Sequence, residues 1–218
     1  MKTLAIFVHQ PQCSVQSANG VMQALAGGYR FKIFTRHEIE SDFFHDVDAV
    51  VVPGGTGDAD TYDRLMPNHV SAIRHFVAAG GQYIGICMGA YWAGRYYFDM
   101  LQDIKVEQYI RQPITNTRRP HPKAMPVTWQ GHDTRMYFYD GACFVGSGPH
   151  KVLATYETGQ AMAIHQNGLT LIGCHPESQQ DWFADHTWMR RHWHGGWHHV
   201  LLRHLVDQVL DNELTLAH

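Results

Sequence analysis

The stretch Gln82-Tyr83-Ile84-Gly85-Ile86-Cys87-Met88-Gly89 decides the fold. A cysteine stands between two glycines, directly after a strand-like run, and helix-compatible residues follow it. This is the layout of a nucleophile elbow, a sharp strand-to-helix turn that lifts one side chain above the sheet and needs small flanking residues to close. With Cys87 at its tip, the turn predicts attack by a thiolate on a carbonyl-type carbon.

Short β-rich runs alternate with longer helix-compatible segments through the first half of the chain. The run at 47–52 is apolar except for one acid, which is typical of a strand buried on both faces. This alternation predicts a parallel sheet with helices on both faces. The expected strands lie at 3–8, 29–34, 47–52 and 82–86, and the expected helices at 14–26 and 69–79.

Beyond residue 104 the pattern changes to closely spaced strands. Residues 115–126 are rich in Pro and Arg and are expected to form a loop or excursion. An antiparallel section should follow, with Gln166-Asn167-Gly168 as a hairpin cue. With no internal repeat and no linker, we expect one domain over residues 1–218. The strands expected here lie at 127–129, 135–139, 152–156, 161–164 and 169–174, and an amphipathic helix is expected at 197–210.

Composition and charge exclude several classes of protein. The 218 residues are 44% hydrophobic and 17% charged, which is ordinary for a globular protein with a sizeable core. A formal net charge of -3 gives no electrostatic case for a nucleic acid or an anionic membrane as partner. No apolar run approaches the roughly 18 residues of a membrane span.

The cysteines and the first apolar run bear on the compartment. The apolar run ends at His9-Gln10-Pro11 with no small-residue cleavage site, so we expect a buried strand there and not a signal peptide. The four cysteines (Cys13, Cys87, Cys143 and Cys174) include no C-x-x-C pair. Free thiols in a reducing cytoplasm are therefore expected, and a cytoplasmic location with them.

A catalytic thiol needs a base, because a free thiol holds only a few per cent thiolate at neutral pH. Parallel sheets gather functional groups at the carboxyl ends of their strands, so the base should follow another buried strand. His175 follows the run at 169–174. Glu177 lies two residues further on, where a hydrogen bond to His175 would fix the imidazole tautomer.

Stabilising an oxyanion requires backbone N–H groups close to the thiol. Gly54 and Gly55 follow the strand expected at 47–52 and offer amides with no side chain in the way. The amide of Met88, directly after the cysteine, is the second candidate donor.

These motifs occur in a recognisable order. Gly-Gly after a strand, then G-x-C-x-G, then His-Pro-Glu resembles the class I glutamine amidotransferase superfamily, over most of the chain. Within it, residues 85–91 (Gly-Ile-Cys-Met-Gly-Ala-Tyr) and 139–144 (Tyr-Asp-Gly-Ala-Cys-Phe) look most like the N-terminal domain of eukaryotic biotin–protein ligases, which also occurs as a free-standing bacterial protein.

The resemblance implies an α/β fold and a set of site residues. The fold would be a flavodoxin-like three-layer sandwich with a mostly parallel central sheet and an antiparallel excursion in the second half. No cofactor is implied. By resemblance, the catalytic triad would be Cys87, His175 and Glu177, and the oxyanion site would be Gly54, Gly55 and Met88.

Two departures limit what the resemblance implies. Glutamine amidotransferases usually carry a Gln soon after the elbow glycine, which helps to hold glutamine, whereas this chain reads Ala90-Tyr91-Trp92. Glutaminase activity is therefore not carried over. A biotin ligase also needs a separate catalytic domain with a Gly-Arg-Gly-Arg-type adenylate loop, and no such stretch occurs in these residues. Biotin transfer is therefore not expected.

Several other side chains have both a functional and a packing interpretation. Tyr91 and Trp92, just past the elbow, and Tyr139 and Asp140 are candidates for the pocket wall, with helix or sheet packing as the alternative. Among the C-terminal histidines, His194 and His198 have the i, i+4 spacing of zinc ligands. Gly195-Gly196 breaks any single helix between them, so we predict no metal site and favour an aromatic-rich surface or an interface.

Three hypotheses follow from these residues. The first is a cysteine-dependent hydrolase or amidase acting on a small-molecule amide or a similar substrate, or passing ammonia to a protein partner. The second is a binding or regulatory module that keeps the pocket without turnover, as the resemblance to an appended ligase domain suggests. The third is a redox-sensing thiol at Cys87.

Overall fold

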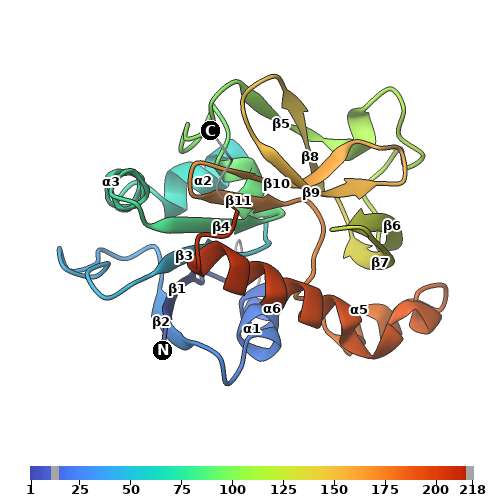
Figure 1. Cartoon of the computed structure of the whole chain (residues 1–218), viewed down its shortest axis with the longest axis horizontal. Coiled ribbons are helices and arrows are strands. Elements are labelled where there is room, and N and C mark those ends of the chain that lie inside the picture. The colour runs from blue at the N-terminus through green and yellow to red at the C-terminus, as the bar shows by residue number, and fades with distance from the viewer. Residues whose placement is uncertain (11–14, 215–218) are drawn as a thin grey trace.

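The computed structural model describes residues 1–10 and 15–214, so Cys13 and Ser14 lie outside the described residues. One sheet runs through the molecule in the order β2-β1-β3-β4-β11-β10-β9-β6-β7 (Figure 1). Strand β8 joins this sheet beside β10, and β5 pairs with β8. The strands from β2 to β11 are mutually parallel. They are β1 (Thr3–Phe7), β2 (Arg30–Phe34), β3 (Ala49–Val52), β4 (Gln82–Ile86) and β11 (Leu169–Ile172).

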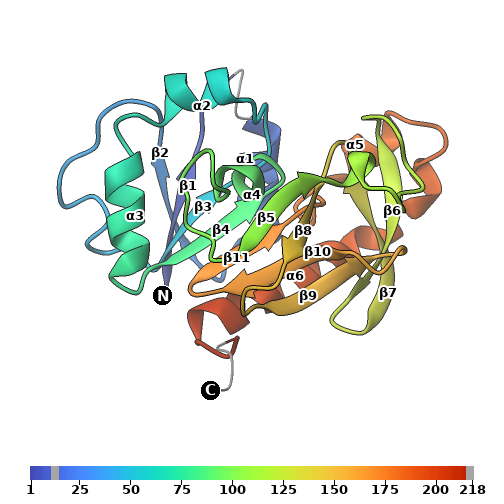
Figure 2. The same ribbon diagram turned by 90° about the horizontal axis from the view of Figure 1, so that it is seen from above.

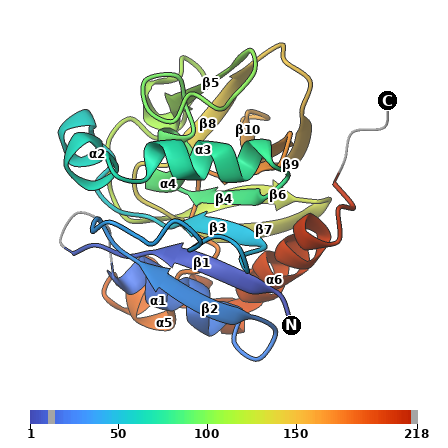
Figure 3. The same ribbon diagram turned by 90° about the vertical axis from the view of Figure 1, so that its left-hand side faces the viewer.

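Helices cover both faces of the parallel strands (Figure 3). Alternate strand residues enter two separate cores: Ile6 and Val51 pack with α1 and α6, whereas Ala5 and Val50 face α3 and α4. The predicted mixed α/β architecture, with a mostly parallel sheet between helical layers, is confirmed. One face carries α1 (Val15–Ala24) and α6 (Trp197–Leu210), and the other carries α2 (Ala59–Leu65), α3 (Val70–Ala78) and α4 (Met88–Trp92). The short helix α5 (Gln180–Ala184) lies away from the parallel strands and packs beside the antiparallel half (Figure 1).

The antiparallel section predicted for the second half is also present and extends the sheet to one side (Figure 2). Short 3-10 turns lie at Tyr109–Arg111, Arg190–His192 and His194–Gly196. The strands are β5 (Ile104–Gln108), β6 (Lys123–Trp129), β7 (His132–Phe138), β8 (Ala142–Gly146), β9 (Lys151–Tyr156) and β10 (Ala161–Gln166).

Several elements differ from the sequence-based expectations. Strands β5 and β8, which pair with each other, and helices α2 and α5 were not predicted. Strand β6 begins at Lys123, inside the segment expected to be a loop. It tolerates Pro126 because β9 pairs with β6 only at Val127–Trp129, so the missing N–H costs no bond on that side. Within the two described segments, residues 1–10 and 15–214, no helix is long and apolar enough to cross a membrane.

Candidate active site

Cys87 stands alone at the turn between β4 and α4. The strand ends at Ile86 and the helix begins at Met88, and Cys87 has φ 49° and ψ -100°. A positive φ is uncommon for a residue with a side chain and persists only where the surroundings enforce it. The Cys87 N–H donates to the carbonyl of Ile172 (2.8 Å), and its carbonyl accepts from the amide of Tyr91 (3.0 Å). These bonds hold Cys87 at the carboxyl ends of β4 and β11.

The turn depends on the glycine that follows it. A Cβ on Gly89 would lie 1.9 Å from the carbonyl oxygen of Val52 in β3. Helix α4 therefore packs directly on the neighbouring strand, and only a residue without a side chain permits that approach.

His175 and Glu177 follow β11, the strand next to β4. The amide of His175 donates to the carbonyl of Tyr137 in β7 (2.9 Å), which ties this segment to the antiparallel half. Nδ1 of His175 lies 2.8 Å from Oε1 of Glu177, and both residues are buried. The rings of Tyr137 and Trp182 pack edge-on against the imidazole. The side chain of His175 is thus held on several sides, and Glu177 sets its orientation.

The surroundings of His175 determine its charge. Burial by itself lowers the pKa of this imidazole, but the Glu177 carboxylate and the neighbouring Cys87 outweigh burial and raise the pKa to about 10. The imidazolium is therefore the dominant form at neutral pH.

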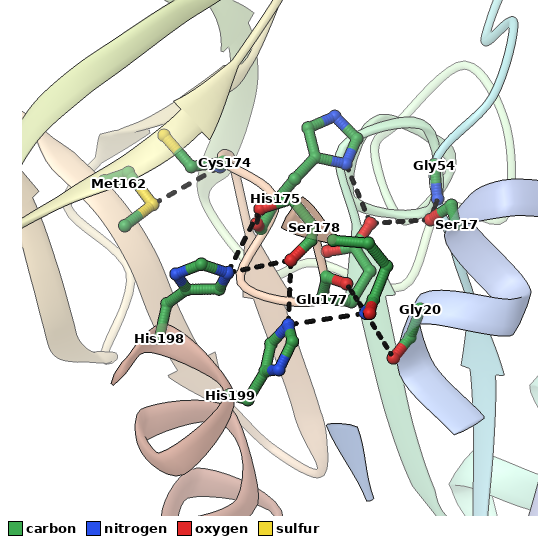
Figure 4. Close-up of polar contacts among 11 residues, drawn as sticks. Ser17, Gly20, Gly54, Met162, Cys174, His175, Glu177, Ser178, His198 and His199 are labelled. Atoms are coloured by element: carbon green, nitrogen blue, oxygen red, sulfur yellow. Dashed lines mark hydrogen bonds and ion pairs between the residues drawn. The ribbon is translucent and has the colours of Figure 1, made fainter. Parts of the chain in front are cut away.

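Ser17 belongs to the same network, and sequence reasoning missed it. Its hydroxyl donates to Oε1 of Glu177 (2.6 Å) and accepts from the amide of Gly54 (2.8 Å), as Figure 4 shows. Ser17 lies on α1, after the first parallel strand, so it shares the sheet edge with Cys87 and His175. Only this position after a parallel strand could have indicated that Ser17 belongs to the site, because a serine within a helix is not distinctive by itself.

This contact changes the expectation for Gly54. Its N–H, predicted to face an oxyanion, has Ser17 as an acceptor inside the protein. Its lack of a side chain is essential in another way, since a Cβ would lie 2.5 Å from Cε1 of His175. Gly55 and Met88 both line the cleft in front of Cys87, and the Met88 N–H has no hydrogen-bond partner among the described residues.

Cys87 and His175 open into a cleft of about 960 Å³. The parallel half supplies its floor, including Ser17, Gly54 and Met88. Its walls come from the antiparallel half and from α5, and they include several residues that sequence reasoning did not single out. These are Val106, Glu107, Gln108, Arg111, Tyr137, Asp181, Trp182, Asp185 and His186.

The structure brings three of the four predicted pocket candidates to this cleft. Tyr91, Tyr139 and Asp140 line it, and the Tyr91 hydroxyl donates to the carbonyl of Asp140 (3.2 Å). Trp92 differs from the expectation, because it is fully buried in the core beside Phe7 and does not line the cleft. Its indole N–H donates to the carbonyl of Gly57 (3.3 Å).

The other two described cysteines are in different surroundings. Cys143 and Cys174 are fully buried. Burial raises the pKa of the Cys143 thiol to about 12, with Glu107 adding to the shift, and it raises that of Cys174 still further. Both sulfurs therefore stay protonated at neutral pH, as expected for packed core residues.

The C-terminal histidines support the loop that carries Glu177. Nε2 of His198 and Nε2 of His199 each lie 2.8 Å from the carbonyl oxygen of Ser178 (Figure 4). Both imidazoles must donate to that oxygen, so they anchor the residue directly after Glu177. Among residues 1–10 and 15–214, no group of three or more His, Cys, Asp or Glu side chains is arranged to hold a metal ion.

Comparison with known families supports the resemblance seen in the motifs. The model of the family described as "Biotin-protein ligase, N terminal" matches residues 10–108, which include the elbow. No curated protein matches the chain. The predicted resemblance to the N-terminal domain of biotin–protein ligases, within the class I glutamine amidotransferase-like fold, is confirmed.

Solved structures share the fold across nearly the whole chain. A glutamine amidotransferase from Thermotoga maritima has a TM-score of 0.67 at 12% identity, covering 96% of this chain and 98% of that chain. PurLQS from the same organism has a TM-score of 0.65 at 14% identity, covering 98% of this chain and 99% of that chain. A glutamine amidotransferase from Methylobacillus flagellatus has a TM-score of 0.58 at 15% identity, covering 84% and 73%. At these identities the likeness shows the fold alone.

Proposed function

We propose that the protein is a cysteine-dependent hydrolase or amidase that cleaves a C–N bond in a small amide. The observation that carries this proposal is the buried pair of His175 and Glu177, 2.8 Å apart, in the same cleft as the strained Cys87. Backbone strain and buried ionisable groups both lower the stability of a folded protein. Both are concentrated in this cleft, as they are at catalytic sites.

In this proposal, Cys87 is the nucleophile and His175 the acid and base. The thiolate attacks the amide carbon and a C–S bond forms, while the carbonyl oxygen takes the negative charge. Glu177 accepts from Nδ1 of His175, which leaves Nε2 to protonate the departing nitrogen as the C–N bond breaks. Water, deprotonated by the same nitrogen, then hydrolyses the thioester.

The oxyanion is assigned to the amides at the start of α4 and in the glycine loop. The Met88 N–H has no partner among the described residues and lies at a helix N-terminus beside the sulfur. Gly55 is the second donor proposed. Gly54 serves the site through Ser17 and through the room it leaves for the His175 ring.

A binding or regulatory module is the second candidate. It is favoured by Ala90-Tyr91-Trp92, where amidotransferases hold glutamine, and by the match to a domain named for its place in a ligase. Such a module would keep the cleft and bind an amide or a protein partner without turnover.

Ammonia release from a panel of small amides separates the two candidates. The wild-type chain should release ammonia from at least one amide, and Cys87→Ser and His175→Ala should each abolish the release. Tight binding of an amide with no release, in a protein whose Cys87 is alkylated rapidly at pH 7, would favour the module.

A further inference from the structure

One wall of the cleft holds a carboxylate whose acceptor capacity is not used up. Oδ2 of Asp140 accepts from Nε2 of Gln108 (2.8 Å), while Oδ1 is shielded from solvent and has no partner among the described residues. Burial raises the pKa of Asp140, although Gln108 and Arg111 oppose the shift. A partly desolvated carboxylate with an unused acceptor oxygen is stabilised when a bound molecule donates a hydrogen bond to that oxygen.

Asp140 lines the same cleft as Cys87, and Tyr91 is hydrogen-bonded to both residues. Tyr91 lies one turn past the elbow and its amide donates to the Cys87 carbonyl, while its hydroxyl donates to the Asp140 carbonyl. Burial raises the pKa of Tyr91, and the Cys87 and Asp140 groups add to the shift. One tyrosine residue therefore links the backbone carbonyl of Cys87 to the backbone carbonyl of Asp140.

The charges around the cleft favour a cation. Of the described side chains that line it, five are carboxylates, and the cations are Arg111 and the imidazolium of His175. Arg111 is exposed, and no ion pair within 4.0 Å joins it to Asp140. The carboxylates are Asp58, Glu107, Asp140, Asp181 and Asp185.

We propose that Asp140 is a specificity-determining residue, and that the substrate is an amide carrying a cationic amine or amidine about one tyrosine length from the scissile carbon. This rests on the proposed function of Cys87 as a nucleophile. The cationic group donates to the Asp140 carboxylate and so places the amide carbon at the sulfur; Gln108 holds that carboxylate, and Tyr91 holds the Asp140 backbone. Anionic amides are rejected by the same carboxylates.

The test uses thiol reagents that differ in charge and react by the same chemistry: aminoethyl (cationic), methyl (neutral) and sulfonatoethyl (anionic) methanethiosulfonate. Rates at Cys87 are followed by peptide mapping and divided by the rates with free mercaptoethanol. We expect the cationic reagent to exceed the neutral one by about tenfold, the worth of one charge-assisted hydrogen bond. Asp140→Asn should bring the ratio of the cationic rate to the neutral rate close to one.

Asp42→Asn is the matched control, because it removes the same charge from an exposed turn that does not line the cleft. It should keep the cationic preference. Equal normalised rates for all three reagents on the wild-type chain overturn the proposal, and a faster anionic reagent assigns specificity to Arg111 instead. Both outcomes are read without any variant, so a misfolded Asp140→Asn protein does not prevent a decision. If the proposed function itself fails, even the neutral rate at pH 7 is no faster than that of a free thiol.

Discussion

The parallel and antiparallel halves of the sheet contribute different parts of the site. Cys87, His175 and Glu177 follow parallel strands, and buried hydrogen bonds or close backbone contacts hold each of them. The antiparallel half supplies Gln108, Arg111 and other cleft-wall residues that are half-buried or exposed. In the proposed function, the reactive groups therefore belong to the buried parallel half, and the groups that would select the substrate belong to the more exposed antiparallel half.

The largest effect should come from crowding the imidazole within the parallel half. In Gly54→Ala the new Cβ would lie 2.5 Å from Cε1 of His175, so the ring must leave its place. Cys87 alkylation at pH 7 should slow by about 30-fold, because the imidazolium that the proposed mechanism uses to activate the thiol moves away. Gly28→Ala is the control, since its Cβ would come closest to the end of the Arg203 side chain and would otherwise make an ordinary contact with the Leu25 carbonyl oxygen (3.6 Å). An unchanged rate in Gly54→Ala would refute the placement of His175.

Glu177→Gln should have the next largest effect and slow Cys87 alkylation at pH 7 by about tenfold. The substitution keeps the shape of the side chain and removes the carboxylate charge. Burial then governs His175, and its pKa falls. The change also affects stability. A raised pKa of His175 stabilises the folded state fully below the unfolded value near 6.5, and this contribution is lost as the pH rises through about 10.

The free energy of unfolding of wild type should therefore decline between pH 7 and pH 10 more steeply than that of Glu177→Gln. Urea denaturation at several pH values measures both. Parallel curves for the two proteins would show that Glu177 does not set the charge of His175.

Ser17→Ala should have a smaller effect, about threefold on alkylation. It removes one donor to Glu177 and leaves the Gly54 amide without this acceptor, at a cost of about 1–2 kcal/mol in the free energy of unfolding. Ser17→Thr restores the hydroxyl and should recover most of the alkylation rate. A purely structural role for Ser17 would lower stability without altering that rate.

The smallest effect should come from the cleft wall. Tyr91→Phe removes the hydrogen bond to the Asp140 carbonyl and little else. Alkylation by a neutral reagent should stay within about twofold of wild type, because a single partly exposed neutral hydrogen bond is worth about 1 kcal/mol or less. Preference for a cationic reagent should decrease, since Asp140 is less firmly held. If Tyr91→Phe is alkylated much more slowly by the neutral reagent, reactivity depends on both halves of the sheet, and the proposed division between them is wrong.

The same division explains what the sequence could predict. Parallel strands are buried on both faces, so 47–52 and 82–86 stand out as apolar runs, and loops at their carboxyl ends must converge. That reasoning brought Cys87, His175 and Glu177 to one edge. It missed Ser17, because a serine in a helix carries no sign of the carboxylate it will meet.

The antiparallel half was harder to read for a physical reason. Strand β5 alternates buried and exposed residues over only Ile104–Gln108, and β8 begins directly after the turn at Asp140 and Gly141. Their pairing depends on contacts between strands distant in sequence. The side of α4 that Trp92 occupies was likewise decided by packing against Phe7 and not by its place after the elbow.

Alkylation of Cys87 by iodoacetamide as a function of pH, in wild type and in His175→Ala, tests the central claim most directly. If the imidazolium of His175 activates the thiol, wild type is labelled rapidly at pH 7, and His175→Ala is labelled rapidly only above about pH 8.5, where a free thiol ionises. Identical profiles for the two proteins, both rising only above about pH 8.5, would contradict the account.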